Sequence, residues 1–334
     1  MHLSLHNILF LTSLSAGTLL TISSSSWFGA WAGLELNLLS FIPLITSNNT
    51  RYSSEAALKY FLIQALGSSL VIFSSSTLMF SSYLFSTILA SALLLKLGAA
   101  PLHFWFPQVM EGMLWPQAAI LMTIQKIAPI FLLSHLTESY NIFLILLVSS
   151  IISAMTGAVG GINQMSLRKI MAFSSINHIA WMLAANLVSE SLLFFYFMFY
   201  CAISMTIVMT FFFQQSFHFN HLFNQNNLAT PVKVITFMSL LSLGGLPPFA
   251  GFVPKWILIQ ELVNFKLFSI LAALLISSLI TLYYYLRISI SFFNMASIKL
   301  APGLLQTPHH FVNTPLFVSM NMFILILPLC FIFY

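Results

Sequence analysis

Four ionisable residues lie inside apolar stretches of this 334-residue chain. They are Glu35, Lys96, Lys126 and Lys255, and each is flanked by enough hydrophobic sequence to belong to a membrane span. A charged side chain at the centre of a bilayer costs about 2.5–3.5 kcal/mol on insertion scales, so such residues mark ion pathways or buried pairs. The alternative for any one of them is a structural ion pair or a side chain that reaches the membrane surface. Three lysines and one carboxylate together favour a proton relay.

Lysine is suited to carrying a proton at membrane depth. Burial lowers the pKa of an amine, and a nearby carboxylate raises it. A movement of Glu35 toward or away from Lys96 would therefore switch the lysine between holding and releasing a proton. Spacing along the chain does not place these two residues together, so their contact is a hypothesis.

Two hydrophobic segments are interrupted beside these lysines. Residues 95–101 read LKLGAAP and residues 241–247 read LSLGGLP, so both follow the pattern L-x-L-G-x-x-P. Proline removes a backbone donor and glycine loosens a helix, so each spanning helix should break there and leave free carbonyl groups. Two interrupted segments in corresponding positions are typical of transporters built from inverted repeats. Because Ser242 aligns with Lys96, we do not expect the two halves to be equivalent proton channels.

Two histidines are secondary candidates for the relay. His103 lies in the first interruption, and His178 follows two serines and an asparagine within a span. Imidazole titrates near neutral pH, so either ring could pass protons. The alternatives are a hydrogen bond from His103 to the freed carbonyls and helix–helix hydrogen bonding by His178.

The composition places nearly the whole chain in lipid. It is 59% hydrophobic and 5% charged, with a mean hydropathy of +0.98, whereas a soluble domain carries about 25% charged residues. The few basic residues argue against nucleic-acid binding. There is no glycine-rich nucleotide loop, no GxSxG and no HExxH, and two cysteines cannot hold an iron–sulfur cluster. We therefore expect no cofactor and no metal on this chain, and any redox chemistry on a partner.

Hydropathy predicts an all-α, polytopic membrane protein with about eleven spans in a single integral membrane domain over residues 1–334. The inverted-repeat halves would cover roughly 4–136 and 141–291, with two broken spans crossing in opposite directions. The predicted spans are 4–22, 27–45, 57–80, 83–110 (broken), 116–136, 141–159, 167–186, 191–213, 232–263 (broken), 267–291 and 312–333.

Basic residues gather on one side of this topology. Arg51, Lys59, Arg168 and Lys169 fall on the side of the N-terminus, whereas Lys266 stands alone among the basic residues of the other side. Positively charged loops stay on the cytoplasmic or matrix side of a membrane. The N-terminus is therefore expected on that side, and the C-terminus on the opposite side.

Several blocks of this sequence, in one order, resemble the chain 2 family of NADH-ubiquinone oxidoreductases, and in particular its animal mitochondrial form. The resemblance extends from about residue 27 to residue 287. The blocks are 31–37 (WAGLELN), 54–61 (SEAALKYF), 96–105 (KLGAAPLHFW), 125–129 (QKIAP), 167–178 (LRKIMAFSSINH), 243–249 (LGGLPPF) and 255–256 (KW).

This resemblance implies a proton-pumping, antiporter-like subunit in the membrane arm of respiratory complex I. Glu35 and Lys96 match a pair whose opening or closing sets the acidity of the lysine, and Lys126 and Lys255 match the next stations of a central hydrophilic axis. NADH, FMN, the iron–sulfur clusters and ubiquinone would be bound by partner subunits. The expected location is the mitochondrial inner membrane, with the N-terminus in the matrix and the C-terminus in the intermembrane space. The expected partners are other membrane-arm subunits and inner-membrane lipids such as cardiolipin.

Two other functions stay open at this point. A subunit of a multi-subunit cation/proton antiporter would share the broken-helix core, although the block at 243–248 argues against it. A membrane scaffold without its own proton path would use the same lysines as structural groups. Pumping by lysine variants would separate the scaffold from a translocator.

Overall fold

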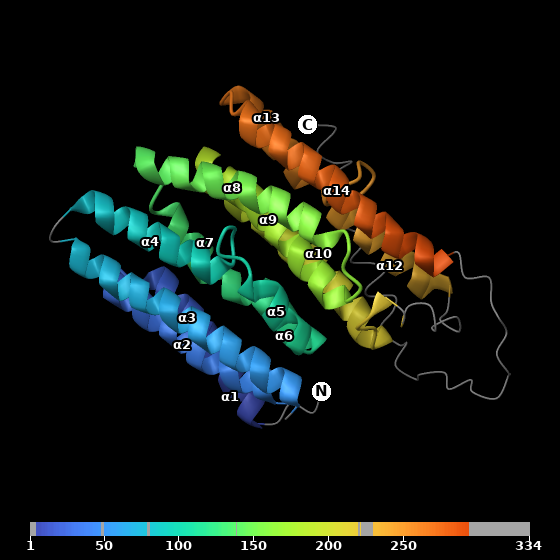
Figure 1. Cartoon of the computed structure of the whole chain (residues 1–334), viewed down its shortest axis with the longest axis horizontal. Helices are drawn as coiled ribbons and strands as arrows, with labels where there is room; N and C mark the ends of the chain where they lie inside the picture. The colour runs from blue at the N-terminus through green and yellow to red at the C-terminus, as the bar shows by residue number, and fades with distance from the viewer. Residues whose placement is uncertain are drawn as a thin grey trace.

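The computed structural model describes residues 5–47, 50–78, 81–137, 139–219, 221 and 230–293 (Figure 1). This part of the chain is α-helical, in agreement with the predicted fold class. Seven of its helices, and the segment Trp115–Ser134, are long and apolar enough to cross a membrane. The helices are α1 (Leu5–Ser23), α2 (Trp27–Thr46), α3 (Arg51–Thr77), α4 (Ser82–Leu97), α5 (Trp105–Gly112), α6 (Trp115–Met122), α7 (Ile124–Ser134), α8 (Tyr140–Gly161), α9 (Leu167–Val188), α10 (Glu190–Gln214), α12 (Thr230–Gly244), α13 (Phe252–Asn264) and α14 (Phe268–Phe293).

The helices form a bundle in which neighbours in sequence pack side by side. Helices α1 to α4 lie along one edge and α12 to α14 along the opposite edge, with α8, α9 and α10 between them (Figure 1). The buried apolar side chains form two clusters, one that includes Phe106 and Trp115 and one that includes Leu93 and Trp181. Most large apolar side chains on the outside belong to the long helices, as expected for a surface in contact with lipid.

The first predicted break, within 83–110, is confirmed. Helix α4 ends at Leu97, and Gly98 adopts a left-handed conformation with φ +73°. The N–H groups of Gly98 and Ala99 then bond back to carbonyls at the end of α4, which is the usual cap formed by a left-handed glycine. The chain resumes as α5 at Trp105.

The second predicted break, within 232–263, is also confirmed, but its register differs from the sequence alignment. Helix α12 ends at Gly244, and the left-handed residue is Gly245, with φ +78°. Counted back from the left-handed glycine, Lys96 corresponds to Leu243, and Ser242 corresponds to Leu95. The assignment of Ser242 to the place of Lys96 is therefore corrected by one residue. Among the described residues, four candidate spans lie between the two breaks: α6–α7, α8, α9 and α10.

The span predicted over 116–136 is not continuous. It is divided at Thr123 into α6 and α7. The Thr123 hydroxyl donates to the carbonyl of Ala119, and the N–H of Lys126 bonds to the carbonyl of Thr123 in a tight turn. Pro129 has no N–H for the carbonyl of Gln125, which weakens the first turns of α7. This third interruption precedes Lys126 by three residues.

The predicted span at 312–333 lies outside the described residues, as does most of the polar stretch between α10 and α12. The predicted number of spans therefore stays a prediction.

Candidate functional site

The three lysines named from the sequence are all buried within the bundle. Their exposed fractions are 6% for Lys96, 2% for Lys126 and 5% for Lys255. Each lies within a few residues of a helix interruption. The sequence pattern therefore located the buried amines correctly, although it located only two of the three interruptions.

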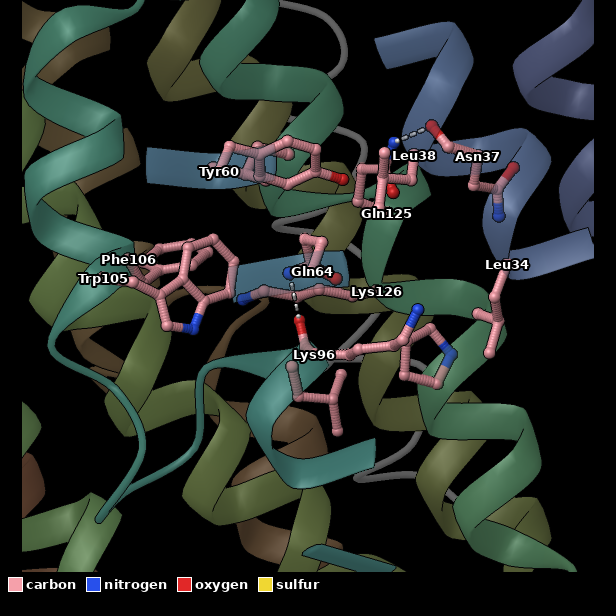
Figure 2. Close-up of a pocket in the computed structure, with 13 residues that line it drawn as sticks. Leu34, Asn37, Leu38, Tyr60, Gln64, Lys96, Trp105, Phe106, Gln125 and Lys126 are labelled. Carbon is pink, nitrogen blue, oxygen red and sulfur yellow. Dashed lines mark hydrogen bonds between the residues drawn. The ribbon is translucent and has the colours of Figure 1, made fainter. Parts of the chain in front are cut away.

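Lys96 occupies the last turn of α4, where the helix end is capped by neutral side chains. The amide of Gln64 on α3 donates to the carbonyl of Lys96 at 3.3 Å (Figure 2). The indole N–H of Trp105 donates to the carbonyl of Leu95 at 3.0 Å. Gly67 on α3 gives the lysine stem room, because a Cβ there would lie 2.9 Å from Lys96 Cγ. Within the described residues, the Lys96 amine makes no hydrogen bond or ion pair.

Lys126 lies in the first turn of α7, directly after the interruption at Thr123. Its amine donates to the hydroxyl of Tyr200 on α10 at 3.2 Å. It also lies 4.9 Å from the centre of the Tyr200 ring and 5.2 Å from the centre of the Phe106 ring. Aromatic faces attract an ammonium group, so these two rings compensate part of its lost hydration.

A small polar cavity lies between Lys96 and Lys126. Its volume is about 20 Å³, enough for about one water molecule. Polar groups from α2, α3 and α7 line it together with both lysines, and they are drawn in Figure 2: Asn37, Tyr60, Gln64 and Gln125. The structure therefore brings the first two lysines to one site that can hold a bridging water.

Glu35 lies on α2 beside this cavity but does not form an ion pair with Lys96. Its neighbours Leu34 and Asn37 line the cavity, and Glu35 itself is half-buried. Its charge acts electrostatically on Lys96, yet the described residues form only two ion pairs, Lys59–Glu55 and Lys169–Glu111. The Glu35–Lys96 pair is open in this structure, so its closing remains a prediction.

Lys255 in the second half is anchored to the break itself. It lies in the first turn of α13, and its amine donates to the carbonyl of Gly244, the last residue of α12, at 2.9 Å. The amine also lies 5.5 Å from the centre of the Trp181 ring on α9. A Cβ on Gly245 would lie 2.8 Å from Lys255 Cδ, so the lysine packs directly on the left-handed glycine.

His178 on α9 lies between the second and third lysines. Its Nδ1 is 2.9 Å from the hydroxyl of Tyr196 on α10, and its ring centre is 5.1 Å from that of Tyr200. The charges of both Lys126 and Lys255 act on it. A second cavity of about 10 Å³ is lined by His178, Tyr196, Tyr200 and Ser242 among others.

His103 is buried in the first break but does not line either cavity. Its ring packs on Phe104, with 4.4 Å between ring centres, and its Nδ1 has no partner among the described residues. The structure thus groups His178 with the lysines and leaves His103 apart. Across the described ranges, no cluster of three or more His, Cys, Asp or Glu residues is arranged to hold a metal ion.

Sequence reasoning did not identify Gln64, Thr123 or Tyr200. Gln64 and Tyr200 have no spacing relationship to the lysines along the chain, since they come from other helices. For Thr123 the signal was Pro129, three residues after Lys126, because a proline inside a span weakens the helix before it.

Comparison with known proteins matches this architecture to one family. The sequence model of the family described as NADH:quinone oxidoreductase/Mrp antiporter, TM, matches residues 24–83 and 75–281. NADH-ubiquinone oxidoreductase chain 2 of Anopheles gambiae is 51% identical over 296 residues, which is 86% of both chains. The protein of the same name from Locusta migratoria is 40% identical over 291 residues, covering 85% of this chain and 84% of the other.

Solved structures with a similar fold include a chain of respiratory complex I from Thermus thermophilus. It has a TM-score of 0.85 at 23% identity, covering 98% of this chain and 78% of the other. A chain of the Mrp complex from Dietzia sp. DQ12-45-1b has a TM-score of 0.80 at 15% identity, covering 96% of this chain and 74% of the other. At these identities the likeness concerns the fold.

Proposed function

We propose that this chain, which belongs to the NADH-ubiquinone oxidoreductase chain 2 family, moves protons through the membrane by way of Lys96, Lys126 and Lys255. It is a proton-translocating membrane subunit of respiratory complex I, the NADH:ubiquinone oxidoreductase. One observation carries the assignment of the residues: Lys96 and Lys126 are buried at two helix interruptions and border one polar cavity.

The first step is a change in the distance between Glu35 and Lys96. An opposite charge at about 4 Å is worth about 4 kcal/mol at the effective dielectric of a partly solvated site. Moving one charge across about 150 mV requires about 3.5 kcal/mol. Opening or closing this pair therefore changes the affinity of Lys96 for a proton by the amount that pumping needs. The half-buried position of Glu35 leaves it room to move without unpacking α2.

The next steps pass the proton from the first half of the chain to the second. With the pair open, Lys96 gives its proton to a water in the shared cavity, and Lys126 receives it. Aromatic rings and one hydroxyl hold the charged form of Lys126. His178 and Lys255 follow as the stations of the second half, and His103 has a structural role at the first break.

Partner subunits hold NADH, FMN, the iron–sulfur clusters and ubiquinone, and this chain has no redox site of its own. The lack of nucleotide and cluster motifs in the sequence supports this division.

A charge such as Glu35, partly exposed on a helix at membrane depth, is unfavourable against lipid, which supports a neighbouring membrane-arm subunit on that surface. The basic end of the bundle, with Arg168 and Lys169, suits the phosphates of cardiolipin.

We place this chain in the mitochondrial inner membrane, with the N-terminus in the matrix and the C-terminus in the intermembrane space. The charge asymmetry of the loops supports this orientation. The four candidate spans between the two breaks would make the broken segments cross in opposite directions, which supports an origin by inverted repetition.

The test is the number of protons pumped per NADH oxidised in sealed vesicles that carry the assembled complex. We expect Lys96→Ala, made in a homologue that can be mutated, to lower this ratio while the complex still assembles. Lys59→Ala is the matched control, because Lys59 is an exposed lysine on α3 that pairs only with Glu55 among the described residues. If Lys96→Ala leaves assembly, turnover and the pumping ratio at wild-type values, the relay is wrong and the chain is a scaffold.

A further inference from the structure

One side chain, Tyr200 on α10, lies where the two cavities approach each other. Lys126 lines the first cavity and Tyr200 lines the second. The hydrogen bond between the Lys126 amine and the Tyr200 hydroxyl, at 3.2 Å, joins the two sites. Tyr200 is buried, so contacts with the protein rather than with solvent fix the position of its hydroxyl.

The face of α10 that carries Tyr200 contacts both Lys126 and His178. Residues four apart lie on one face of a helix, and Tyr196, one turn before Tyr200, is 2.9 Å from His178 Nδ1. Because Nδ1 already has Tyr196 as its partner, Nε2 is the nitrogen of His178 that remains for exchange. Within the described residues, no hydrogen bond joins Lys126 to His178 directly. A proton that leaves Lys126 toward the second half therefore meets the Tyr200 hydroxyl first.

We propose that the Tyr200 hydroxyl is the proton-conducting link between Lys126 and the second cavity. The Lys126 N–H bond breaks as an O–H bond forms on Tyr200, and in the same step Tyr200 releases its original proton to a water in the second cavity. That water passes its proton to His178. Tyr200 is neutral before and after the step, and rotation of its hydroxyl restores the starting arrangement. No oxidant or reductant takes part.

The sizes and positions of the two cavities favour this route. A volume of about 10 Å³ is the lower limit for one water, and both His178 and Tyr200 border this cavity. The Tyr200 ring is also a cation–π partner of Lys126, at 4.9 Å. The ring and the hydroxyl thus have separable roles: the ring stabilises the charge on Lys126, and the hydroxyl carries the proton onward.

Replacement of Tyr200 by phenylalanine separates these roles, since it keeps the ring and removes the hydroxyl. In sealed vesicles with the assembled complex, we expect Tyr200→Phe to lower the number of protons pumped per NADH by as much as Lys126→Ala does. Tyr284→Phe is the matched control, because Tyr284 is an equally buried tyrosine whose ring packs on Tyr285 and which lines neither cavity. The control is expected to keep the wild-type ratio.

This inference depends on the proposed function, and the same set of variants tells their failures apart. If Lys126→Ala keeps the wild-type ratio, the proposed function fails at Lys126. If Lys126→Ala lowers the ratio but Tyr200→Phe does not, the relay stands and the role of Tyr200 is overturned. If Tyr284→Phe lowers the ratio equally, the role of Tyr200 is also overturned, because the loss of any buried tyrosine hydroxyl would then lower pumping.

A second variant decides the question if Tyr200→Phe does not assemble. Tyr200→His keeps an aromatic ring and provides a group that both donates and accepts a proton. We expect it to pump more protons per NADH than Tyr200→Leu, which has neither. Equal ratios for the two variants would overturn the proposal.

Discussion

The two predicted breaks look alike in sequence but hold their lysines differently. At the first break, Gln64 and Trp105 bond to the carbonyls at the end of α4, so the Lys96 amine is left without a hydrogen bond from the described residues. At the second break, the Lys255 amine itself bonds to the terminal carbonyl of α12. A lysine amine without a hydrogen bond to the backbone can respond to Glu35. An amine that donates to the last carbonyl of a helix is fixed in position by that bond. This difference favours Lys96 as the switch and Lys255 as a fixed station.

The largest effect on stability is expected when the anchored lysine is removed. Lys255→Met leaves the buried carbonyl of Gly244 without its donor, which costs about 1–3 kcal/mol. Lys96→Met removes an amine that bonds no described group, so it should cost less. Thermal inactivation of the purified complex compares the two variants directly. If Lys96→Met is the less stable of the two, the assignment of anchored and free lysines is reversed.

The next effect concerns the two left-handed glycines. An alanine in this conformation costs about 1–2 kcal/mol at either site. At Gly245 the added methyl group would also lie 2.9 Å from the Lys255 amine, whereas at Gly98 it would lie 3.2 Å from the Cβ of Phe106. Both variants should therefore lose stability, but only Gly245→Ala should displace a lysine of the proposed relay.

Pumping assays beside thermal inactivation measure these two consequences separately. We expect Gly245→Ala to lower the protons pumped per NADH and Gly98→Ala to leave that ratio near wild type. If the two variants pump similar numbers of protons per NADH, the difference between the two breaks does not affect pumping.

The smallest effect is expected at the neutral cap of the first break. Gln64→Met keeps the size of the side chain but removes the donor to the Lys96 carbonyl, at a cost of about 1 kcal/mol. Thermal inactivation of the complex measures this loss, with Lys59→Ala on the exposed face of the same helix as the reference variant. If the Gln64→Met complex is as stable as wild type, the 3.3 Å hydrogen bond from Gln64 to the Lys96 carbonyl contributes nothing to stability.

Much of the architecture could be predicted because membrane spans follow directly from composition. A bilayer demands long apolar helices, and glycine and proline interrupt them at recognisable patterns, so α4–α5 and α12–α13 were found from the sequence. The break before Lys126 was missed because it depends on a threonine hydroxyl that bonds to the helix backbone. Threonine side chains do this in many continuous helices, so Thr123 itself gives no distinct signal for a break, and the indication in the sequence was Pro129.

The sequence by itself determined which residues are costly to bury, since charge inside an apolar span is visible in one dimension. It therefore identified Glu35, Lys96, Lys126 and Lys255 together with His178 as candidates. Only the tertiary structure decided which of them share a site, because those contacts join helices distant in the chain: α4 with α7 through one cavity, and α7 with α10 through Tyr200. It also decided that Gly245 rather than Gly244 is left-handed, because the position of a helix end depends on how the following segment packs.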